Sequence, residues 1–357
     1  MSLADFKIIV INPGSTSTKL GYFSNDTCLR EKTVRHTASE MKQFPDLLSQ
    51  TGMRVRCVEE FIKENDIDGN SLSAIVGRGG LIRPVESGVY IVNENMLNDL
   101  KSPQAQTHAS SLGGIIAEQF AKRYGIPAYI ADPVVVDELD KKARLSGIPE
   151  INRISVFHAL NAKAVARQCA ADMSKKYEDC RIIVAHMGGG ISVSAHKYGR
   201  VVDVNDGLNG DGPFTPERSG GVPLFPLIKL CYSGKYSEGE MLSKVTKTGG
   251  VLAYLGTNDM RKVAEEAEKD DYTALVLESM AYQVAKEIGA MFIALGGYAD
   301  AIVLTGGLAY SSKITEMIKK QVEMLSEVRI YPGEDELKAL AQGAVRILSK
   351  AEAAKIY

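Results

Sequence analysis

The sequence predicts an α/β protein made of two lobes with related topology, and an internal repeat supports this fold class. The β-branched run Ile8-Ile9-Val10 has a counterpart in Ile182-Ile183-Val184, about half a chain later. At the same spacing Gly14 corresponds to Gly188, so each run leads into a turn that contains glycine. Two equivalent strand-and-turn units in one chain favour two domains of similar topology.

The residues after each run strengthen this interpretation. Alternating side chains predict a second strand in both halves, and a third is expected at 29–34 and at 200–204. We therefore expect lobes over residues 1–155 and 156–357, the closing helix of the chain packing back on the first. The two turns would face one nucleotide from opposite sides, in the cleft between the lobes.

The remaining elements follow from periodicity. Apolar residues spaced by three and four predict helices at 39–65 (divided at Pro45 and Gly52), 107–124, 155–176, 223–230, 237–247, 272–295 and 335–354. Short apolar runs predict strands at 73–76, 128–131, 301–305 and 328–331. Strands that alternate with helices in this way are typical of α/β proteins.

Bulk composition limits the classes of partner. Of the 357 residues 45% are hydrophobic and 24% charged, and the net charge of −2 gives no basic excess for nucleic acid or an anionic membrane. Five cysteines without a CxxC pair, and an amino terminus without a signal-peptide pattern, favour the cytoplasm. Asp300 and two glycine pairs argue against a membrane span at 290–310. We expect small-molecule partners.

The first candidate site is the turn after residues 6–11, with the sequence Asn12-Pro13-Gly14-Ser15-Thr16-Ser17-Thr18-Lys19. Backbone N–H groups, several hydroxyls and one ammonium group could converge here on phosphate oxygens. The Walker pattern is not met, and the residues that follow resemble a returning strand rather than a helix. We expect a phosphate-binding β-hairpin, and an ordinary polar turn is the alternative.

Further candidates follow predicted strands in the first half. Arg78 stands among glycines directly after the strand 73–76, and ligands of open α/β sheets bind at such strand ends. Arg83 is a second candidate in the same loop, and a solvated arginine is the alternative for both. Asp132 follows the strand 128–131, where an Asp-Pro pair also serves as an ordinary turn former.

Candidates in the second half lie on loops and at helix starts. His158 is expected in the first turn of the helix 155–176, where a structural role is the alternative. Arg218 is the most plausible chemical residue of a long loop, 210–221, which is rich in turn formers. Gly306 and Gly307 end a buried strand and would let a planar ligand approach the backbone. Acidic residues at 334–336 complement the dipole of the closing helix.

Together these motifs resemble the acetate and butyrate kinases, within the superfamily of sugar kinases, heat-shock chaperones and actin. Asn-x-Gly-Ser-x-Ser-x-Lys at 12–19 is similar to the first phosphate motif of the family, and His186-Met187-Gly188-Gly189-Gly190 to the second. Residues 302–307 are similar to the adenosine motif. The resemblance covers nearly the whole chain and implies two actin-like (ribonuclease H-like) lobes with the active site in the interdomain cleft.

The resemblance also implies roles for individual residues. Arg78 and Arg218 would flank the transferred phosphoryl group, and His158 would donate a hydrogen bond to it. Asp132 would position the metal or its waters. Residues implied to bind the nucleotide phosphates, Mg²⁺ or the nucleoside are Asn12, Ser15, Ser17, Lys19, His186, Gly188, Gly189, Gly190, Asp259, Arg261, Gly306 and Gly307. Glu336 would serve the metal together with Asn12, and Glu334 and Asp335 are the alternatives.

Two departures from the acetate kinase pattern separate this chain from that branch. His-Met-Gly-Gly-Gly at 186–190 replaces His-Leu-Gly-Asn-Gly, and Glu-Arg-Ser-Gly-Gly at 217–221 replaces Thr-Arg-Ser-Gly-Asp. Both resemble the butyrate branch. The resemblance therefore implies a short-chain fatty acid kinase that uses ATP/ADP and Mg²⁺, as a homodimer or larger homo-oligomer. An acetate or propionate kinase, and a sugar kinase or ATPase of the same superfamily, are the alternatives.

Overall fold

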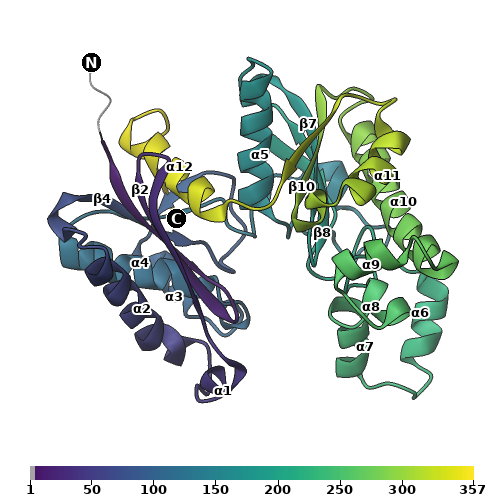
Figure 1. The fold of residues 1–357 in the computed structure, drawn as a ribbon, viewed down its shortest axis with the longest axis horizontal. Coiled ribbons are helices and arrows are strands. Elements are labelled where there is room, and N and C mark those ends of the chain that lie inside the picture. Colours follow the sequence, from purple (N-terminus) through teal and green to yellow (C-terminus); the bar gives the residue numbers. More distant parts are fainter. Residues whose placement is uncertain (1–4) are drawn as a thin grey trace. The chain divides into compact units, whose positions relative to one another are not determined.

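The computed structural model describes residues 5–357 and divides the chain into two compact units, each of which is described by itself (Figure 1). Unit 1 comprises Met1–Val136 and Asp335–Tyr357, and unit 2 comprises Asp137–Glu334. Residues 137–155, expected in the first lobe, thus belong to unit 2. Residues 335–357, expected to pack back from the second lobe, belong to unit 1.

Unit 1 is built on a seven-stranded sheet with the strand order β12-β5-β6-β4-β1-β2-β3. Its strands are β1 (Lys7–Pro13), β2 (Ser17–Ser24), β3 (Thr27–Arg35), β4 (Leu72–Arg78), β5 (Val89–Ile91), β6 (Ala128–Ala131) and β12 (Lys355–Ile356). β1, β2 and β3 form an antiparallel meander, whereas β4 runs parallel to β1 and β6 runs parallel to β4.

Helices cover both faces of this sheet. They are α1 (Ala38–Met41), α2 (Thr51–Glu64), α3 (Glu94–Leu100), α4 (Ser111–Tyr124) and α12 (Glu336–Leu348). Because side chains alternate along a strand, Ile9 and Ile11 of β1 join a core cluster with α2 and α4. Ile8 and Val10 are also fully buried and point to the opposite face, where α12 packs against β1 and β4 (Figure 1).

Unit 2 repeats this arrangement on a five-stranded sheet with the order β11-β10-β7-β8-β9. Its strands are β7 (Arg181–Met187), β8 (Ile191–Lys197), β9 (Arg200–Val204), β10 (Ala301–Gly306) and β11 (Val328–Pro332). β7, β8 and β9 form an antiparallel meander, and β10 and β11 extend the sheet in parallel. The two meanders with their parallel extensions have the same topology, so the predicted fold class, an α/β protein of two related lobes, is confirmed.

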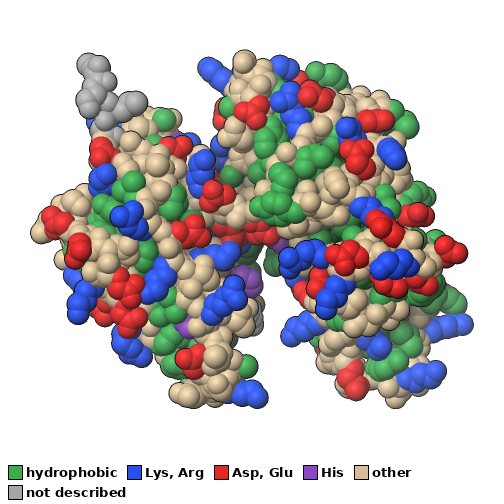
Figure 2. All heavy atoms as spheres, in the orientation of Figure 1, with side chains coloured by type: hydrophobic (Ala, Val, Ile, Leu, Met, Phe, Trp, Pro, Cys, Tyr) green, Lys and Arg blue, Asp and Glu red, His purple; other side chains and the backbone are tan. Residues whose placement is uncertain are grey.

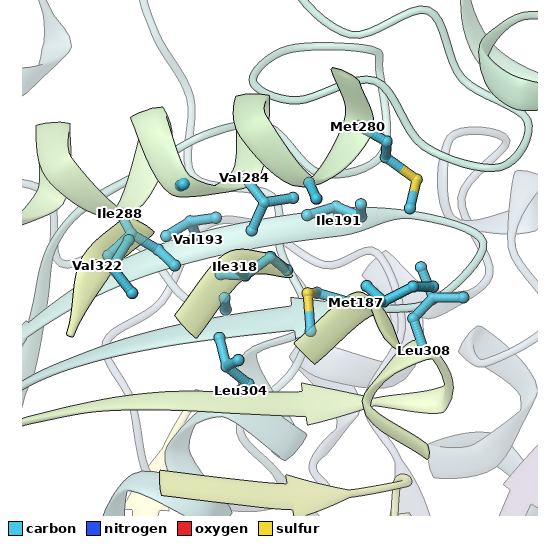
Figure 3. Packing of buried hydrophobic residues seen from close by; sticks show 14 of the residues in the cluster. Met187, Ile191, Val193, Met280, Val284, Ile288, Leu304, Leu308, Ile318 and Val322 are labelled. Atoms are coloured by element: carbon cyan, nitrogen blue, oxygen red, sulfur yellow. The ribbon is translucent and has the colours of Figure 1, made fainter. Parts of the chain in front are cut away.

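The core of unit 2 lies between this sheet and two long helices. The helices of the unit are α5 (Ala159–Asp172), α6 (Leu224–Cys231), α7 (Glu238–Thr246), α8 (Gly250–Leu255), α9 (Met260–Glu266), α10 (Asp271–Ala294) and α11 (Ser312–Val322). Figure 3 shows Val284 and Ile288 of α10 and Ile318 of α11 among the buried side chains that pack on the strands. α5 packs against β7 and β10 instead, so β7 has a helix on each face.

The close approach of two strands requires glycine at one position of the adenosine motif. Gly306, the last residue of β10, has φ +87°. A Cβ built on it would collide with the backbone of Met187 in the neighbouring strand β7. Only glycine fits a position with a positive φ and no room for a side chain.

The expected helix bounds differ from the observed ones at the functionally important start of α5. The helix begins at Ala159, so His158 is its N-cap residue and does not lie in its first turn. Its backbone conformation, φ −76° and ψ 57°, is not helical. The sequence predicts a start at residue 155, because periodicity does not distinguish a buried extended segment from a first helical turn.

Surface features agree with the balanced composition. On the face seen in Figure 2, basic and acidic side chains are interspersed. Within residues 5–357 no helix has the length and apolar character that crossing a membrane requires. Cys28, Cys57, Cys169, Cys180 and Cys231 are free thiols.

Candidate functional site

The first turn connects β1 and β2 and presents its hydroxyl groups outward. The Gly14 N–H donates to the carbonyl of Ser17 over 2.8 Å and closes the turn. Ser15 and Lys19 are exposed, and Ser17 is half-buried. Among residues 5–357 no ion pair of Lys19 is formed, so its ammonium group is available for an anion.

A buried arginine holds this turn from behind. Arg54 of α2 has an exposed fraction of 0%. Its Nη1 donates to the carbonyl of Ser17 over 2.8 Å, and its Nη2 donates to the carbonyl of Gly14, also over 2.8 Å. Within the described part of the chain it has no carboxylate partner, and burial lowers the pKa of its guanidinium from the ordinary value. The turn therefore carries a fixed positive charge on its inner side.

Three residues meet at the carboxyl ends of β1 and β4. Arg78 Nη1 forms an ion pair with Glu336 Oε1, and Asn12 Nδ2 donates to Glu336 Oε2 over 2.6 Å. The short parallel register of β1 and β4 brings Asn12 and Arg78 together, and the first residue of α12 supplies Glu336. The structure thus brings together three candidate residues that lie far apart along the chain.

A histidine that the sequence did not single out lies beside this group. The pKa of His108 is lowered by burial and by the charge of Arg78, and the Glu336 carboxylate opposes this shift. His108 Nδ1 lies 2.6 Å from the Ser110 hydroxyl oxygen. A neutral His108 therefore adds no positive charge next to Arg78.

The candidates that the sequence left open have different partners in the structure. Arg83 Nε donates to Asp99 Oδ2 over 2.8 Å, and its guanidinium lies 4.8 Å from the centre of the Tyr357 ring. Arg83 is thus engaged away from Asn12 and Glu336. Of the acidic residues at 334–336, Glu336 contacts Asn12, whereas Asp335 caps α12 by accepting from the Lys338 N–H over 3.0 Å.

Asp132 is placed in a turn-like setting at the end of β6. It is buried and has φ +37°, an uncommon value for a residue with a side chain. Its Oδ1 accepts from the Ser87 hydroxyl over 2.7 Å and from the Gly88 N–H over 2.9 Å. These contacts join the loop before β5 to the end of β6, as the turn-forming alternative predicts.

The second turn, Gly188–Gly190, connects β7 and β8 and is flanked by two histidines. The rings of His158 and His186 stack with their centres 3.9 Å apart and their planes at 13°. His158 Nδ1 lies 3.0 Å from the Ser192 hydroxyl oxygen. His186 has an exposed fraction of 1%, and its Nε2 lies 3.4 Å from Glu334 Oε1.

Arg218 reaches this turn from the long loop. Its Nη1 donates to the carbonyl of Gly207, and a Cβ built on Gly190 would collide with that same Nη1. Burial lowers the pKa of the Arg218 guanidinium, against the opposing effect of Glu217 and Asp206. The Arg218 backbone N–H donates to the Thr215 hydroxyl over 2.9 Å, and that hydroxyl donates to the Gly189 carbonyl over 2.7 Å.

A cavity of about 940 Å³ opens beside the second turn, entirely within unit 2. A volume of this size suits a small-molecule ligand. Predicted residues that line it are Gly188, Gly189, Asp259, Arg261 and Gly307. Asp259 is also the N-cap of α9, since its Oδ1 accepts from the Arg261 N–H over 3.2 Å. Gly190 and Gly306 are not among the lining residues, and Gly306 instead allows β10 to approach β7.

Besides His108, sequence reasoning missed Arg54 and Asn161, which hold other parts of these sites in place. Arg54 lies four and seven residues before Val58 and Phe61, on the buried face of α2, so helical spacing could have identified it. Asn161 of α5 contacts His186, and it follows His158 by three residues. No local pattern identifies Asn161, because its partners come from β7 and β10.

Comparison with known proteins places this chain among kinases. The model of the acetokinase family matches residues 150–356. Two proteins named "Probable butyrate kinase", from Clostridium botulinum strains Alaska E43 / Type E3 and Eklund 17B / Type B, are each 51% identical over 353 residues. In both comparisons 99% of this chain and 99% of the relative are covered.

Solved structures with low sequence identity share the fold. Acetate kinase from Porphyromonas gingivalis has a TM-score of 0.79 at 18% identity, with 96% of this chain and 100% of that chain covered. Propionate kinase from Francisella tularensis subsp. tularensis SCHU S4 has a TM-score of 0.73 at 20% identity, with 95% of this chain and 98% of that chain covered. The resemblance expected from the sequence motifs is therefore confirmed, and this chain belongs to the acetokinase family.

Proposed function

We propose that this chain is a short-chain fatty acid kinase. It transfers a phosphoryl group reversibly between ATP and butyrate, or a branched acid such as isobutyrate, and produces an acyl phosphate and ADP. The observation that carries the proposal is the likeness, over nearly the full length of both chains, to proteins named as probable butyrate kinases. Family membership supports the enzyme class, a phosphotransferase with a carboxyl group as acceptor.

The chemistry requires charge stabilisation rather than a general base. A short fatty acid has a pKa near ~4.8, close to that of a glutamate side chain, so the acceptor is already ionised at neutral pH. The enzyme must instead reduce the repulsion between a carboxylate and a polyphosphate, and stabilise the charge on the phosphoryl group during in-line transfer. Cations and neutral hydrogen-bond donors supply that stabilisation.

The candidate residues have this character in both units. In our proposal Arg78 and Arg218 contact the transferred phosphoryl group, and His158 donates a hydrogen bond to it. Lys19, Ser15 and Ser17 contact the nucleotide phosphates from the first turn, and the glycines of the second turn do so from unit 2. The nucleoside occupies the cavity lined by Asp259, Arg261 and Gly307, whose volume suits a ligand of this size.

The oxygen donors that a magnesium ion requires are present in unit 1. Mg²⁺ in phosphoryl-transfer enzymes is commonly bound by one or two protein carboxylates, by phosphate oxygens and by waters. Asn12 and Glu336 contact each other and offer amide and carboxylate oxygens, and these two residues would hold the ion, with Asp132 acting on it or its waters. When bound, the ion would neutralise charge on the nucleotide phosphates. Arg78, which pairs with Glu336, would then be repositioned towards substrate.

The alternatives within the superfamily need different residues. A sugar kinase requires a carboxylate base for a hydroxyl acceptor, and Asp132 is the candidate. Its Oδ1 accepts hydrogen bonds from the Ser87 hydroxyl and the Gly88 N–H, and these contacts fix the side chain in a turn. Discrimination between acetate, propionate and butyrate depends on pocket volume, since one methylene group contributes about 1–3 kcal/mol. A cytoplasmic location and a homo-oligomeric state stay predictions.

An acyl-hydroxamate assay tests the proposal directly. Purified protein is incubated with ATP, Mg²⁺ and each acid from acetate to valerate, together with isobutyrate, and hydroxylamine traps any acyl phosphate. We expect the highest kcat/KM with butyrate or isobutyrate, and reactions without ATP serve as controls. A preference for acetate would favour the alternative that the chain is an acetate kinase. If no acid gives product while the folded protein binds ATP, the carboxylate kinase proposal is wrong.

A further inference from the structure

A buried network of side chains fixes the protonation of the histidine beside the second turn. His186 faces α5, because alternate residues of β7 point to opposite sides of the sheet. His186 Nδ1 lies 2.8 Å from Asn161 Nδ2. Both residues are buried, so this hydrogen bond is shielded from water.

The neighbouring threonine determines which way the Asn161 amide points. The Thr305 hydroxyl donates its single proton to the Gly333 carbonyl over 3.2 Å. Its oxygen can therefore only accept from Asn161, and the donor is the amide nitrogen Nδ2 at 3.3 Å. The same nitrogen faces His186, so His186 Nδ1 is an acceptor and the neutral ring carries its proton on Nε2.

The Nε2 proton is directed to the second turn without a hydrogen-bond partner. Nε2 is buried and makes no hydrogen bond within residues 5–357. Glu334 Oε1 lies 3.4 Å away, and a Cβ built on Gly188 would lie 3.8 Å from Nε2. A buried donor without a partner is unfavourable, and a ligand oxygen at this position would remove that cost.

A second contact holds the plane of the ring. The stacked ring of His158 lies parallel to His186 at 3.9 Å, and His158 is itself 3.0 Å from the Ser192 hydroxyl oxygen. Rotation of the His186 ring would break the bond to Asn161 and disturb this stack. The Nε2–H group is therefore fixed in direction as well as in protonation.

We propose that Asn161 is a positioning residue that holds His186 in the Nε2–H tautomer, so that the second turn presents a hydrogen-bond donor to a phosphate oxygen of the nucleotide. The identity of the ligand rests on the proposed function, whereas the tautomer follows from the network alone. In the opposite tautomer a lone pair on Nε2 would face the phosphate and repel it. Asn161 acts through His186 and does not contact the substrate.

Histidine ¹⁵N spectroscopy of the full-length wild-type protein tests the tautomer. The chain has only five histidines, and the His186 signals are assigned by their loss in His186→Gln. We expect a protonated Nε2 and an unprotonated Nδ1 in the wild type. A protonated Nδ1 in the wild-type protein would overturn the proposal.

Asn161→Asp then tests the role of the amide, because a carboxylate accepts from Nδ1–H and cannot donate to it. We expect His186 to gain a proton on Nδ1 and kcat/KM for ATP to fall by about 10- to 100-fold, the scale found for residues that orient metal-binding histidines. Gln168→Glu is the matched control, since it makes the same chemical change on the exposed face of α5, where Gln168 contacts Asp172. We expect neither the spectrum nor kcat/KM to change in this control.

The outcomes separate this proposal from the proposed function. An unchanged His186 spectrum in Asn161→Asp, or a changed spectrum with unchanged kcat/KM, would contradict the positioning role. If the expected tautomer is found and adding Mg²⁺ with a non-hydrolysable ATP analogue shifts the Nε2 signal, the positioning role holds even when no carboxylic acid is phosphorylated. In that case only the choice of acceptor would be wrong.

Discussion

The two halves of the molecule use the same strand topology to present different chemistry. Asn12 near the end of β1 and His186 near the end of β7 are equivalent in the sequence repeat, and both face a helix that covers the sheet. Asn12 donates to Glu336 of α12, whereas His186 accepts from Asn161 of α5. Equivalent positions of the two sheets thus contact a charged carboxylate in unit 1 and a neutral amide in unit 2.

The turns that follow these residues are supported by different means. In the first turn the buried guanidinium of Arg54 holds the carbonyls of Gly14 and Ser17. In the second turn small residues allow Arg218 and Gly207 to approach Gly190. The difference predicts that an added methyl group would disrupt the second turn, and that loss of a charge would disrupt the first.

The largest effect is expected for Arg218→Ala. An arginine that stabilises a transferring phosphoryl group contributes about 10³–10⁵ in rate in related enzymes, so turnover should fall by that order. Nucleotide affinity and the fold should be largely retained, because the Arg218 backbone contacts that hold the loop do not need its side chain. Steady-state kinetics and ATP titration measure the two quantities. Normal turnover in the folded variant would show that Arg218 has no catalytic role.

A smaller but still large effect is expected for Gly190→Ala, which tests steric support of the second turn. The new Cβ would collide with Arg218 Nη1 and lie 2.7 Å from the Gly207 carbonyl oxygen, so the guanidinium must move. We expect kcat to fall by about 10²-fold, the scale of a misplaced catalytic group. Gly289→Ala is the control, because a Cβ added at this position of α10 would meet no atom of the described chain within 4 Å beyond its own helical turn. Equal activity of the two variants would show that the second turn tolerates a side chain.

The smallest of these effects is expected for Arg54→Met, which tests the electrostatic support of the first turn. The variant loses the buried charge and the hydrogen bonds to the Gly14 and Ser17 carbonyls. We therefore expect KM for ATP to rise about 10-fold, equivalent to ~1.4 kcal/mol. The unfolding temperature without ligand should change little, since an unpaired buried charge is itself costly. The increase in unfolding temperature that MgATP produces should change more.

Arg56→Met provides the matched control on the exposed face of α2. A purely structural role of Arg54 predicts the opposite pattern, in which the unliganded protein loses stability and the MgATP-induced increase is unchanged. Thermal unfolding with and without MgATP therefore distinguishes the two roles.

By itself the sequence determined the fold class, an α/β protein of two related lobes, and named several members of the candidate site. Strand periodicity and the repeated Ile-Ile-Val run were sufficient because both are local patterns along the chain. Arg78 was identified by its position after a predicted strand and Arg218 by its place in a long loop, whereas His186 became a candidate only through the family resemblance. Nothing in the sequence measured the distances between them.

Only the tertiary structure decided which polar groups meet. It joined Glu336 to Asn12, engaged Arg83 with Asp99, and assigned residues 137–155 to unit 2, whereas the sequence predicts them in the first lobe. It also placed Arg54 behind the first turn and Asn161 against His186. These contacts depend on helices packing across sheets between residues distant in the chain, a geometry that local periodicity does not encode.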